Sequence, residues 1–445
     1  MSDREQWSSQ SGFILATIGS AVGLGNIWRF SYVAGENGGG AFLVLYLIYV
    51  FVIGLPLVIA ELALGRRAQG DAIAAFDGPA PGSRWRYAGV FVGAGAVLIL
   101  SYYSVIAGWA LKYFTGASLG HLWDTASEGY GRYFQSFISH TGEPVIWQAA
   151  MLIAAALVVA GGVRGGIETL NRFLMPLLAV IIIGLAVFAV TLPGAQRGIA
   201  FLLAPDWSAF ARAEVHAAAL GQAFFSLGIG MAVFLTYGSY MPRSFPLPRS
   251  AVAIAAGDSC FAIVAGLAIF PAVFSFGIDP TSGPELAFIT LPQVFLQMPV
   301  GILLGAAFFF LLSAAALTSM VSLLEVPVAI LVQRLAMSRR RATALVGTAV
   351  LVLGLPSALS FGLLSDVRIG RHGILDAADA AVSNFLLPIG GILIALTVGW
   401  RLSRQDAIAE SELQHPWLAN AWLWVLMLMV PLTLATILLQ SASAL

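Results

Sequence analysis

The stretch GSAVGLGNIWRF, Gly19 to Phe30, interrupts an apolar run that begins at Gly12 and otherwise has the composition of a membrane-spanning helix. Its glycines weaken a helix, and Asn26 and Arg29 add an amide and a cation. A cation at mid-membrane depth costs about 2.5 kcal/mol or more. Backbone groups freed by such a break are tolerated in a bilayer only where protein, water or a ligand satisfies them. The stretch therefore predicts a lined cavity inside the membrane.

The composition places the whole chain in a membrane. Hydrophobic residues make up 59% of the 445 residues and charged residues only 10%, which is far from the average of a soluble domain. The formal net charge is zero, so bulk electrostatics favours neither nucleic acid nor an anionic lipid surface as a partner. We expect no nucleic-acid partner. The single cysteine, Cys260, excludes an internal disulfide.

Eleven segments have the roughly 20 mainly apolar residues that a membrane helix needs. They lie near residues 12–34, 41–65, 87–115, 145–162, 170–192, 216–241, 250–277, 300–334, 342–360, 376–400 and 417–440. Most connections are short, and only 121–144 and 195–214 resemble sizeable polar loops. We expect one integral membrane domain over residues 1–445. Residues 1–10 lack the pattern of a cleaved signal peptide, so the first span is expected to stay in the protein.

The distribution of basic residues predicts the orientation, because cytoplasmic loops collect Lys and Arg. With the N-terminus inside, 15 of the 22 Lys and Arg side chains fall on the cytoplasmic side. Those that fall outside are Arg132, Arg197, Arg212, Arg368 and Arg371, while Arg29 and Lys112 lie within spans. After eleven spans the C-terminus is expected outside.

A second long apolar run is interrupted at GQAFFSLGIGMA, residues 221–232, by Ser226, Gly228 and Gly230. A half-helix that ends at a break presents carbonyls to a cation, and one that begins there presents N–H groups to an anion. Two five-span repeats, the second inverted, would bring the two breaks together at mid-membrane, as in many secondary transporters. Close helix packing through small residues is the alternative for each glycine-rich span.

Polar residues within other spans add to this picture. Charged residues there usually face a cavity or each other, and they are Arg29, Glu61, Asp258, Glu325, Asp376 and Asp379. A structural ion pair or a position near the membrane interface stays open as the alternative, above all for Glu61 and Glu325. The adjacent hydroxyls of Thr318 and Ser319 either bond to a carbonyl of the preceding turn or offer hard oxygen ligands to a small cation.

Several motifs of the chain resemble those of the neurotransmitter:sodium symporters. They are AVGLGNIWRF, AGENGGGAF, GQAFFSLGIG, TYGSYM, AFITLPQVF and AALTS, in the expected order between Arg4 and about Leu439. The resemblance, which is to the shorter prokaryotic members, implies an all-α integral membrane protein of the LeuT-type fold. That fold is a 5+5 inverted repeat with broken helices 1 and 6, here expected over residues 1–192 and 216–401, plus an eleventh span over 417–440.

The resemblance also implies two sodium sites. The first would use the carbonyl of Ala21, the side chains of Asn26, Ser226 and Asp258, and the substrate carboxylate. The second would join span one to span eight through the carbonyls of Gly19, Val22 and Ala315 and the hydroxyls of Thr318 and Ser319.

Two departures from the family pattern bear on chloride. Asp258 replaces the usual Asn, and Ala262 stands where chloride-dependent members carry Ser. The other chloride-site positions are matched by Tyr46, Gln222 and Ser226. An ionised Asp258 would supply the fixed negative charge itself, so we expect no chloride requirement.

The implied substrate is an α-amino acid, because Gly23 occupies the position where carriers of amines often have Asp. Its carboxylate would meet the N–H groups near Leu24 and Gly25 and the Tyr103 hydroxyl. Its ammonium group would face carbonyls near Ala21, Phe225 and Ser226. Its side chain would meet Ile99, Tyr103, Phe225, Gly228, Met231, Ser319 and Leu323. This mainly apolar lining, with an adaptable Met, predicts neutral, mainly hydrophobic L-amino acids, aromatic ones included. Helix packing is the alternative role of Ile99, Met231 and Leu323, and taurine, glycine or a β-amino acid is the alternative substrate.

Gate residues follow from the same resemblance. Arg29 and Asp379 would close the outer vestibule, with Asp376 as the rival partner and with Tyr103 and Phe225 as a lid. Arg4 and Trp7 match the inner latch, although its usual acidic partner in span eight is replaced by Gln333. Residues 284–298 resemble the extracellular re-entrant loop.

The function implied by these features is sodium-driven symport by alternating access in a bacterial cytoplasmic (inner) membrane. An enzyme is not expected, because the five histidines form no ligand spacing and Cys260 has no nearby His. An amino-acid sensor or a substrate-gated channel on the same scaffold is the alternative. The oligomeric state is left open.

Overall fold

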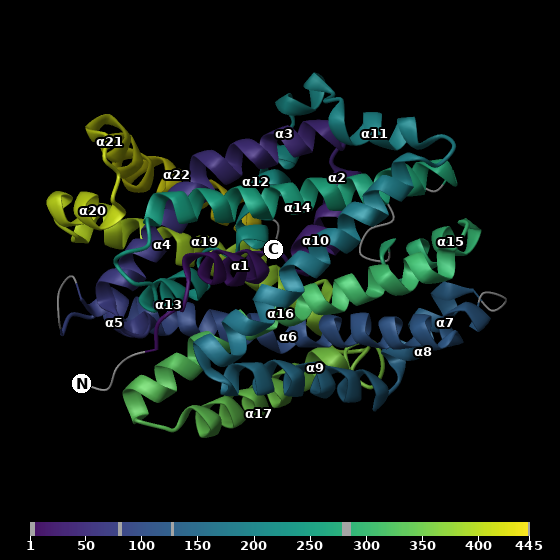
Figure 1. Ribbon diagram of the computed structural model, residues 1–445, viewed down its shortest axis with the longest axis horizontal. Helices are drawn as coiled ribbons and strands as arrows, with labels where there is room; N and C mark the ends of the chain where they lie inside the picture. Colours follow the sequence, from purple (N-terminus) through teal and green to yellow (C-terminus); the bar gives the residue numbers. More distant parts are fainter. Residues whose placement is uncertain (1–4, 79–81, 126–128, 278–285, 444–445) are drawn as a thin grey trace.

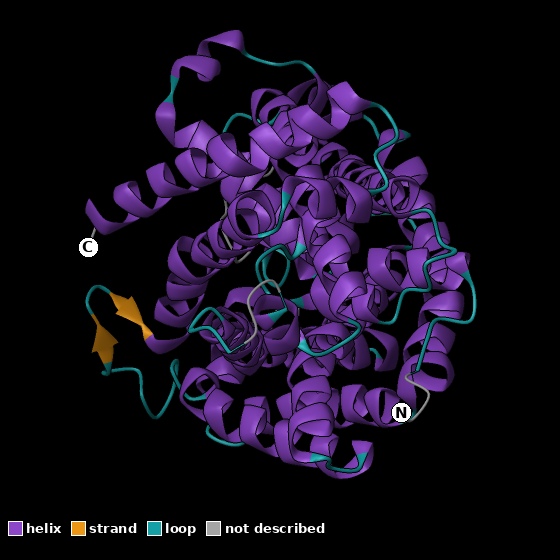
Figure 2. Cartoon of the chain, turned by 90° about the vertical axis from the view of Figure 1, so that its left-hand side faces the viewer, coloured by secondary structure: helices purple, strands orange, loops and turns teal. Residues whose placement is uncertain are grey.

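The computed structural model describes residues 5–78, 82–125, 129–277 and 286–443, and most of these residues are helical. The long helices lie mainly along the longest axis in Figure 1, and many are seen nearly end-on in Figure 2. The only strands among the described residues are β1 (Arg368–Ile369) and β2 (His372–Gly373), which pair antiparallel in one hairpin.

Nine helices of the described residues are long and apolar enough to span a membrane. Five are continuous α-helices: α6 (Arg86–Leu119), α9 (Glu143–Ala160), α14 (Leu247–Ser275), α16 (Gly301–Leu335) and α17 (Arg339–Ala358). The other four contain π-helical turns and are built from α3 (Gly40–Tyr49), η2 (Val50–Gly54) and α4 (Leu55–Ala68); η4 (Val163–Glu168) and α10 (Thr169–Val190); α18 (Ile374–Ala381), η7 (Val382–Leu386), α19 (Leu387–Leu396) and η8 (Thr397–Arg401); and α21 (Pro416–Trp424), η9 (Val425–Met429) and α22 (Val430–Ser443).

The first predicted break is present. Helix α1 (Gln10–Ala21) ends before the glycines, and the chain resumes as η1 (Gly25–Arg29) and α2 (Phe30–Glu36) after a bend of 53°. The Ser9 hydroxyl caps α1 by accepting a hydrogen bond from the Gly12 N–H at 3.0 Å. The two halves together match the span predicted over 12–34.

The second predicted break is also present, in the span predicted over 216–241. Helices α12 (Ala213–Leu227) and α13 (Val233–Ser239) flank five residues that are not helical. Three of the five residues, Gly228, Gly230 and Ala232, have φ angles of 70°, 85° and 60°. A Cβ on Gly230 would lie 2.7 Å from the Leu387 carbonyl oxygen, so both the backbone conformation and the close approach require glycine there.

The connections carry shorter helices. Within the two predicted polar loops lie α7 (His121–Asp124), α8 (Tyr130–Ser139), α11 (Ala195–Leu203) and η5 (Trp207–Ala211), and elsewhere lie α5 (Ala72–Asp77), α15 (Thr290–Gln297) and α20 (Arg404–Ser411). Helix α15 belongs to the stretch that resembles a re-entrant loop, of which residues 284 and 285 lie outside the described residues. The predicted span boundaries are close except for the fifth, which begins at Val163 rather than 170 because η4 continues the helix through the glycines.

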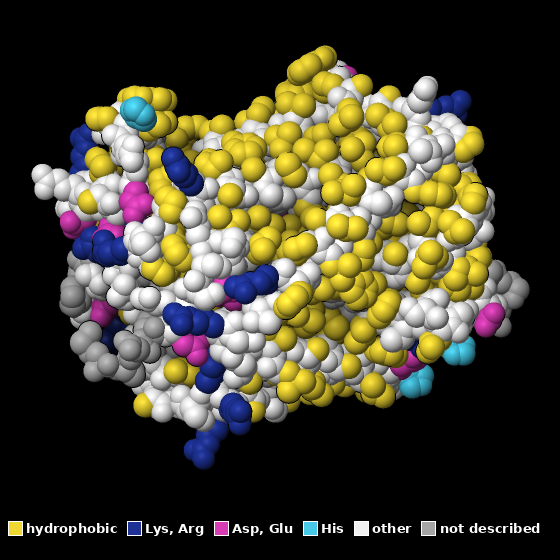
Figure 3. Space-filling model, viewed as in Figure 1, with side chains coloured by type: hydrophobic (Ala, Val, Ile, Leu, Met, Phe, Trp, Pro, Cys, Tyr) yellow, Lys and Arg dark blue, Asp and Glu magenta, His cyan; other side chains and the backbone are white. Residues whose placement is uncertain are grey.

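The broken helix α1 is held inside the bundle, where it packs against α10, α14 and α16. The outer surface is mainly hydrophobic along its middle and carries charged side chains toward its ends. A broad hydrophobic surface covers most of the face in Figure 3, and charged side chains gather at the end where the N-terminus, α5 and α20 lie. This arrangement fits a bundle embedded in lipid, with its polar ends in water.

Candidate functional site

A cavity of about 30 Å³ lies where the two breaks meet. It is lined by Ser20, Ala21, Gly23, Gly25, Ile99, Tyr103, Phe225, Gly228, Met231, Val233, Ser319, Ser322 and Leu323. These residues come from the first broken span, α6, the second broken span and α16. We call this space the inner cavity.

Free backbone groups and a tyrosine meet at one side of the inner cavity. The Leu24 N–H donates to the Tyr103 hydroxyl oxygen at 3.0 Å, so the tyrosine satisfies part of the broken backbone. A Cβ built on Gly23 would lie 2.3 Å from Ser319 Oγ and 2.7 Å from the Tyr103 hydroxyl oxygen. Only glycine fits at this position without displacing both side chains.

The Asp258 carboxylate on α14 is buried and held by three side chains. Its Oδ1 accepts from the Asn26 amide at 2.7 Å. Its Oδ2 accepts from the Ser226 hydroxyl at 2.8 Å and from the Tyr46 hydroxyl at 3.1 Å. All four side chains are at most 1% exposed. Burial of an ionised carboxylate is costly unless hydrogen bonds compensate it, and these donors provide that compensation.

A second group of oxygens lies between α1 and α16. The Ser319 hydroxyl donates to the Ser20 carbonyl at 3.0 Å, and the Thr318 hydroxyl donates to the Ala315 carbonyl at 2.8 Å. Gly19 lies on the same end of α1, where a Cβ would be 2.0 Å from the Asn171 amide oxygen. Among the described residues no cluster of three or more His, Cys, Asp or Glu could hold a metal ion. The oxygens gathered between α1 and α16 are those of carbonyl and hydroxyl groups, hard ligands that suit small cations.

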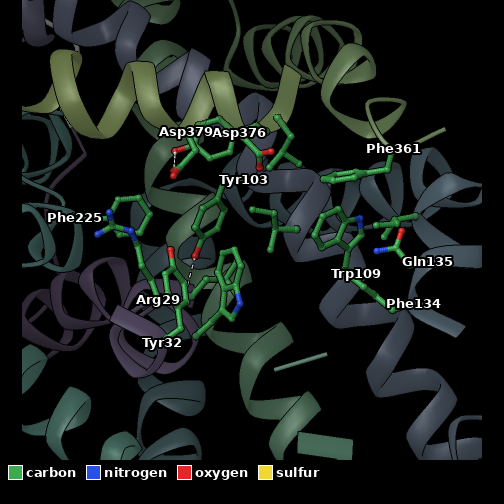
Figure 4. Close-up of a pocket in the computed structure, with 16 residues that line it drawn as sticks. Arg29, Tyr32, Tyr103, Trp109, Phe134, Gln135, Phe225, Phe361, Asp376 and Asp379 are labelled. Carbon is green, nitrogen blue, oxygen red and sulfur yellow. Dashed lines mark hydrogen bonds between the residues drawn. The ribbon is translucent and has the colours of Figure 1, made fainter. Parts of the chain in front are cut away.

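A larger cavity of about 260 Å³ lies beside the inner cavity, and Figure 4 shows its lining. Tyr103 and Phe225 line both cavities and so lie between them. The Arg29 guanidinium lies 4.5 Å from the centre of the Phe225 ring and donates to the Gln222 amide oxygen at 2.9 Å. Asp376 and Asp379 also line this outer cavity, and the Tyr102 hydroxyl donates to Asp379 at 3.0 Å.

Ties between distant segments close the end of the bundle that carries the N-terminal segment. The Trp7 indole N–H donates to the Tyr237 carbonyl at 2.9 Å, and Trp7 is 2% exposed. The Glu325 carboxylate accepts from the Tyr240 hydroxyl at 2.7 Å and forms an ion pair with Arg339. Three separate parts of the chain are joined at this end: the N-terminal segment, the end of α13, and the pair of helices α16 and α17.

Comparison with known protein families decides the identity. The model of the sodium:neurotransmitter symporter family matches residues 4–133 and 125–444. The chain belongs to the sodium:neurotransmitter symporter family. This symporter is thus an integral membrane protein whose transport depends on sodium.

Individual relatives of this symporter agree with that assignment. It is 40% identical over 442 residues to the uncharacterized sodium-dependent transporter YhdH of Bacillus subtilis (strain 168), covering 98% of this chain and 97% of the relative. It is 34% identical to an uncharacterized sodium-dependent transporter of Haemophilus influenzae, covering 98% of both chains. The crystal structure of MhsT in complex with L-phenylalanine matches with a TM-score of 0.93 and 48% identity, covering 98% of this chain and 100% of that one. The predicted LeuT-type fold is confirmed.

The structure brings together most of the substrate residues predicted for the symporter. All of them line the inner cavity except Leu24, which lines the outer cavity, and Ser226, which is buried against Asp258. The inner cavity also includes Ser20, Val233 and Ser322, which the sequence analysis did not place there. Ser322 follows Ser319 by three residues and so lies on the same helix face, a spacing that could have identified it.

The predicted gate residues have mixed placements. Arg29 and Asp379 face the same cavity, but in the described part of the chain no ion pair joins them. Arg4 lies outside the described residues, whereas Trp7 is buried at the end of the bundle that carries the N-terminal segment. For Glu325 the sequence analysis left an ion pair open without naming its partner. In the structure that partner is Arg339.

Glu61 has a different role from an ion pair. Its Oε1 accepts from the Gly230 N–H at 2.8 Å, and its Oε2 has no hydrogen-bond partner among the described residues. This side chain, fully buried on α4, satisfies a backbone group of the second break.

Proposed function

We propose that this symporter takes up neutral, mainly hydrophobic L-amino acids together with two sodium ions, without a requirement for chloride. The observation that carries the proposal is the inner cavity, where broken backbone and an apolar lining adjoin. The backbone N–H groups of Leu24 and Gly25, together with the Tyr103 hydroxyl to which Leu24 donates, suit a carboxylate, and Ile99, Met231 and Leu323 suit an apolar side chain. That MhsT was crystallised with L-phenylalanine supports the same substrate class.

The two predicted sodium sites are supported by the oxygens that the structure gathers. Asn26, Ser226 and Asp258 lie within hydrogen-bond distance of one another at the first site. At the second, Ser319 on α16 donates to the Ser20 carbonyl in the last turn of α1, and the neighbouring Thr318 hydroxyl donates to the Ala315 carbonyl within α16. Because the substrate carboxylate would complete the first site, substrate and sodium bind cooperatively and each raises the affinity for the other.

Chloride independence is supported by the surroundings of the Asp258 carboxylate. Tyr46 and Ser226 match the family's chloride-site positions, and both donate to Asp258 Oδ2. A fixed carboxylate thus occupies hydrogen-bond donors that would otherwise be available to an anion. The protein carries its own negative charge beside the first sodium site.

Alternating access would move this site between the two sides of the membrane. The inner end is tied by Trp7 and by the Glu325–Arg339 ion pair, whereas the outer cavity adjoins the lid residues Tyr103 and Phe225. The breaks that line one cavity belong to residues 1–192 and 216–401, the proposed inverted repeats, with 417–440 as an added span. Basic side chains at the N-terminal end in Figure 3 support a cytoplasmic N-terminus. The proposal includes a C-terminus outside, after eleven spans, and insertion in the inner membrane.

The experiment that tests the substrate class is equilibrium binding of labelled L-phenylalanine to the purified protein, in sodium and in potassium. Binding is expected in sodium and at least tenfold weaker in potassium, with L-leucine competing better than glycine, taurine or β-alanine. Binding that is equal in both cations would contradict the sodium sites. Stronger competition by taurine or glycine would contradict the substrate class.

A further inference from the structure

Two serine hydroxyls form a polar spot in the otherwise apolar part of the inner cavity. Ser20, in the last turn of α1, and Ser322, on α16, both line the cavity. The Ser20 hydroxyl donates to Ser322 Oγ at 2.7 Å. The Ser322 hydroxyl in turn donates to the Ser319 carbonyl at 2.8 Å. Both hydroxyl protons, of Ser20 and of Ser322, are therefore used within this chain of hydrogen bonds. Neither proton is available to a bound ligand.

The direction of these bonds leaves an acceptor at the cavity wall. A serine oxygen has two lone pairs and one proton. Among the residues that the structure describes, none donates a hydrogen bond to the Ser20 hydroxyl oxygen, whose own proton is used by Ser322. The complementary ligand group is consequently a donor.

The position of the pair determines which part of a ligand would reach it. Ser20 lies in the last turn of α1, before the break, whereas Gly25 lies after the break, where the chain resumes as η1. The N–H groups proposed for the carboxylate lie at Leu24 and Gly25. A ligand whose carboxylate is anchored there would extend its side chain across the break toward Ser20, which shares the cavity lining with Val233 and Leu323.

We infer that the Ser20–Ser322 pair is a polar subsite that selects aromatic amino acids whose ring carries an N–H or O–H donor, the chemistry of tryptophan and tyrosine. A purely apolar side chain that covers Ser20 leaves a polar group without a donor, which costs free energy. A ring N–H or O–H satisfies it. This inference rests on the proposed function, because it assumes that the inner cavity binds the amino acid.

The test compares L-tryptophan with L-3-benzothienylalanine, in which sulfur replaces the indole N–H and the ring system keeps nearly the same shape. Each competes with labelled L-phenylalanine for sodium-dependent binding. The wild-type protein is expected to prefer tryptophan by about tenfold, the effect of one buried hydrogen bond of roughly 1.4 kcal/mol. In Ser20→Ala this ratio of affinities is expected to fall to about one.

Two further variants make the result specific. Ser322→Ala removes the acceptor that fixes the Ser20 proton, so the ratio is expected to fall there as well. Ser313→Ala removes a hydroxyl from the same helix, one that donates to the Phe309 carbonyl outside the cavity lining, and is expected to retain the wild-type ratio. Phenylalanine binding in each variant shows that the protein is folded.

The outcomes separate the inference from the proposed function. A wild-type ratio near one, or a tenfold ratio that persists in Ser20→Ala, would overturn the polar subsite while phenylalanine binding still upholds the proposed function. Absence of sodium-dependent phenylalanine binding in the wild-type protein would overturn the proposed function, and the subsite with it.

Discussion

At the scale of single residues, the chain departs from its family at Asp258, and the structure gives the departure a physical consequence. The carboxylate accepts hydrogen bonds from Asn26, Ser226 and Tyr46 in a fully buried position. A neutral amide in its place would offer no fixed charge to balance a sodium ion. An anion from solution would then be needed.

Replacing this carboxylate is therefore expected to create a chloride requirement. Wild-type uptake should be the same in chloride and in gluconate, whereas uptake by Asp258→Asn should fall at least tenfold in gluconate. The double variant Asp258→Asn with Ala262→Ser should recover in chloride, because the serine adds an anion donor. Ala262→Ser alone is the control and should stay independent of chloride. A wild-type protein that fails in gluconate would refute the charge argument.

A second residue-scale prediction concerns Gly23. A methyl group there would lie within 2.7 Å of both Ser319 Oγ and the Tyr103 hydroxyl oxygen, so Gly23→Ala is expected to weaken substrate binding at least tenfold. Gly221 on α12 is the matched control, because nothing lies within 4 Å of its added Cβ. Equal phenylalanine affinities in Gly23→Ala and Gly221→Ala would show that the close packing at Gly23 is unimportant.

At this scale the sequence predicted residue types well and pairings poorly. Asp258 could be placed beside Ser226 because both belong to motifs with a family counterpart. The ion pair between Glu325 and Arg339, and the bond between Ser20 and Ser322, join residues from separate helices or turns. Such contacts depend on how helices pack, which a single sequence does not specify.

At the scale of elements, the fifth span shows why a boundary was predicted incorrectly. Residues 161–166 contain four glycines, a composition that normally indicates a loop. In the structure η4 (Val163–Glu168) begins after the first two glycines, carries the helix through Gly165 and Gly166, and ends in Glu168, which is buried. This carboxylate accepts from the Ser8 N–H at 2.8 Å and from the Ser9 hydroxyl at 3.0 Å. Tertiary contact with the N-terminal segment therefore compensates for weak local propensity.

Removing that contact is expected to loosen the start of the first span. Glu168→Gln takes away charge-assisted hydrogen bonds, each worth about 1.5–3 kcal/mol, so amide hydrogen exchange in residues 5–12 should become at least tenfold faster. The control is Glu214→Gln, an exposed carboxylate in the first turn of α12. Unchanged exchange in Glu168→Gln would mean that other contacts hold the N-terminal segment.

The two breaks were the elements most accurately predicted. Clustered glycines and polar groups inside an apolar run predict a break that lines a cavity. In lipid, the backbone groups freed by a break need hydrogen-bond partners from protein, water or a ligand. The structure adds how this is done, through Tyr103 at the first break and Glu61 at the second. Neither partner is adjacent in sequence to the break that it supports.

At the scale of the whole molecule, the structure combines ties at the end that carries the N-terminal segment with a cavity beside the lid residues. In the proposed alternating-access cycle, this arrangement would be one of the two states. Ligands that bind this arrangement and not the unfolded chain stabilise it by mass action. We therefore expect the midpoint of thermal unfolding in detergent to rise with sodium, to rise further with sodium plus phenylalanine, and to be unaffected by potassium. An equal rise with potassium would indicate a general salt effect and would argue against specific sites.

The measurement that tests the central claim most directly is uptake of labelled L-phenylalanine into proteoliposomes under an inward sodium gradient. A symporter is predicted to raise the internal concentration above the external one and to lose that excess when an ionophore dissipates the gradient. Uptake that only equilibrates, whatever the sodium gradient, would indicate a channel and would contradict the account.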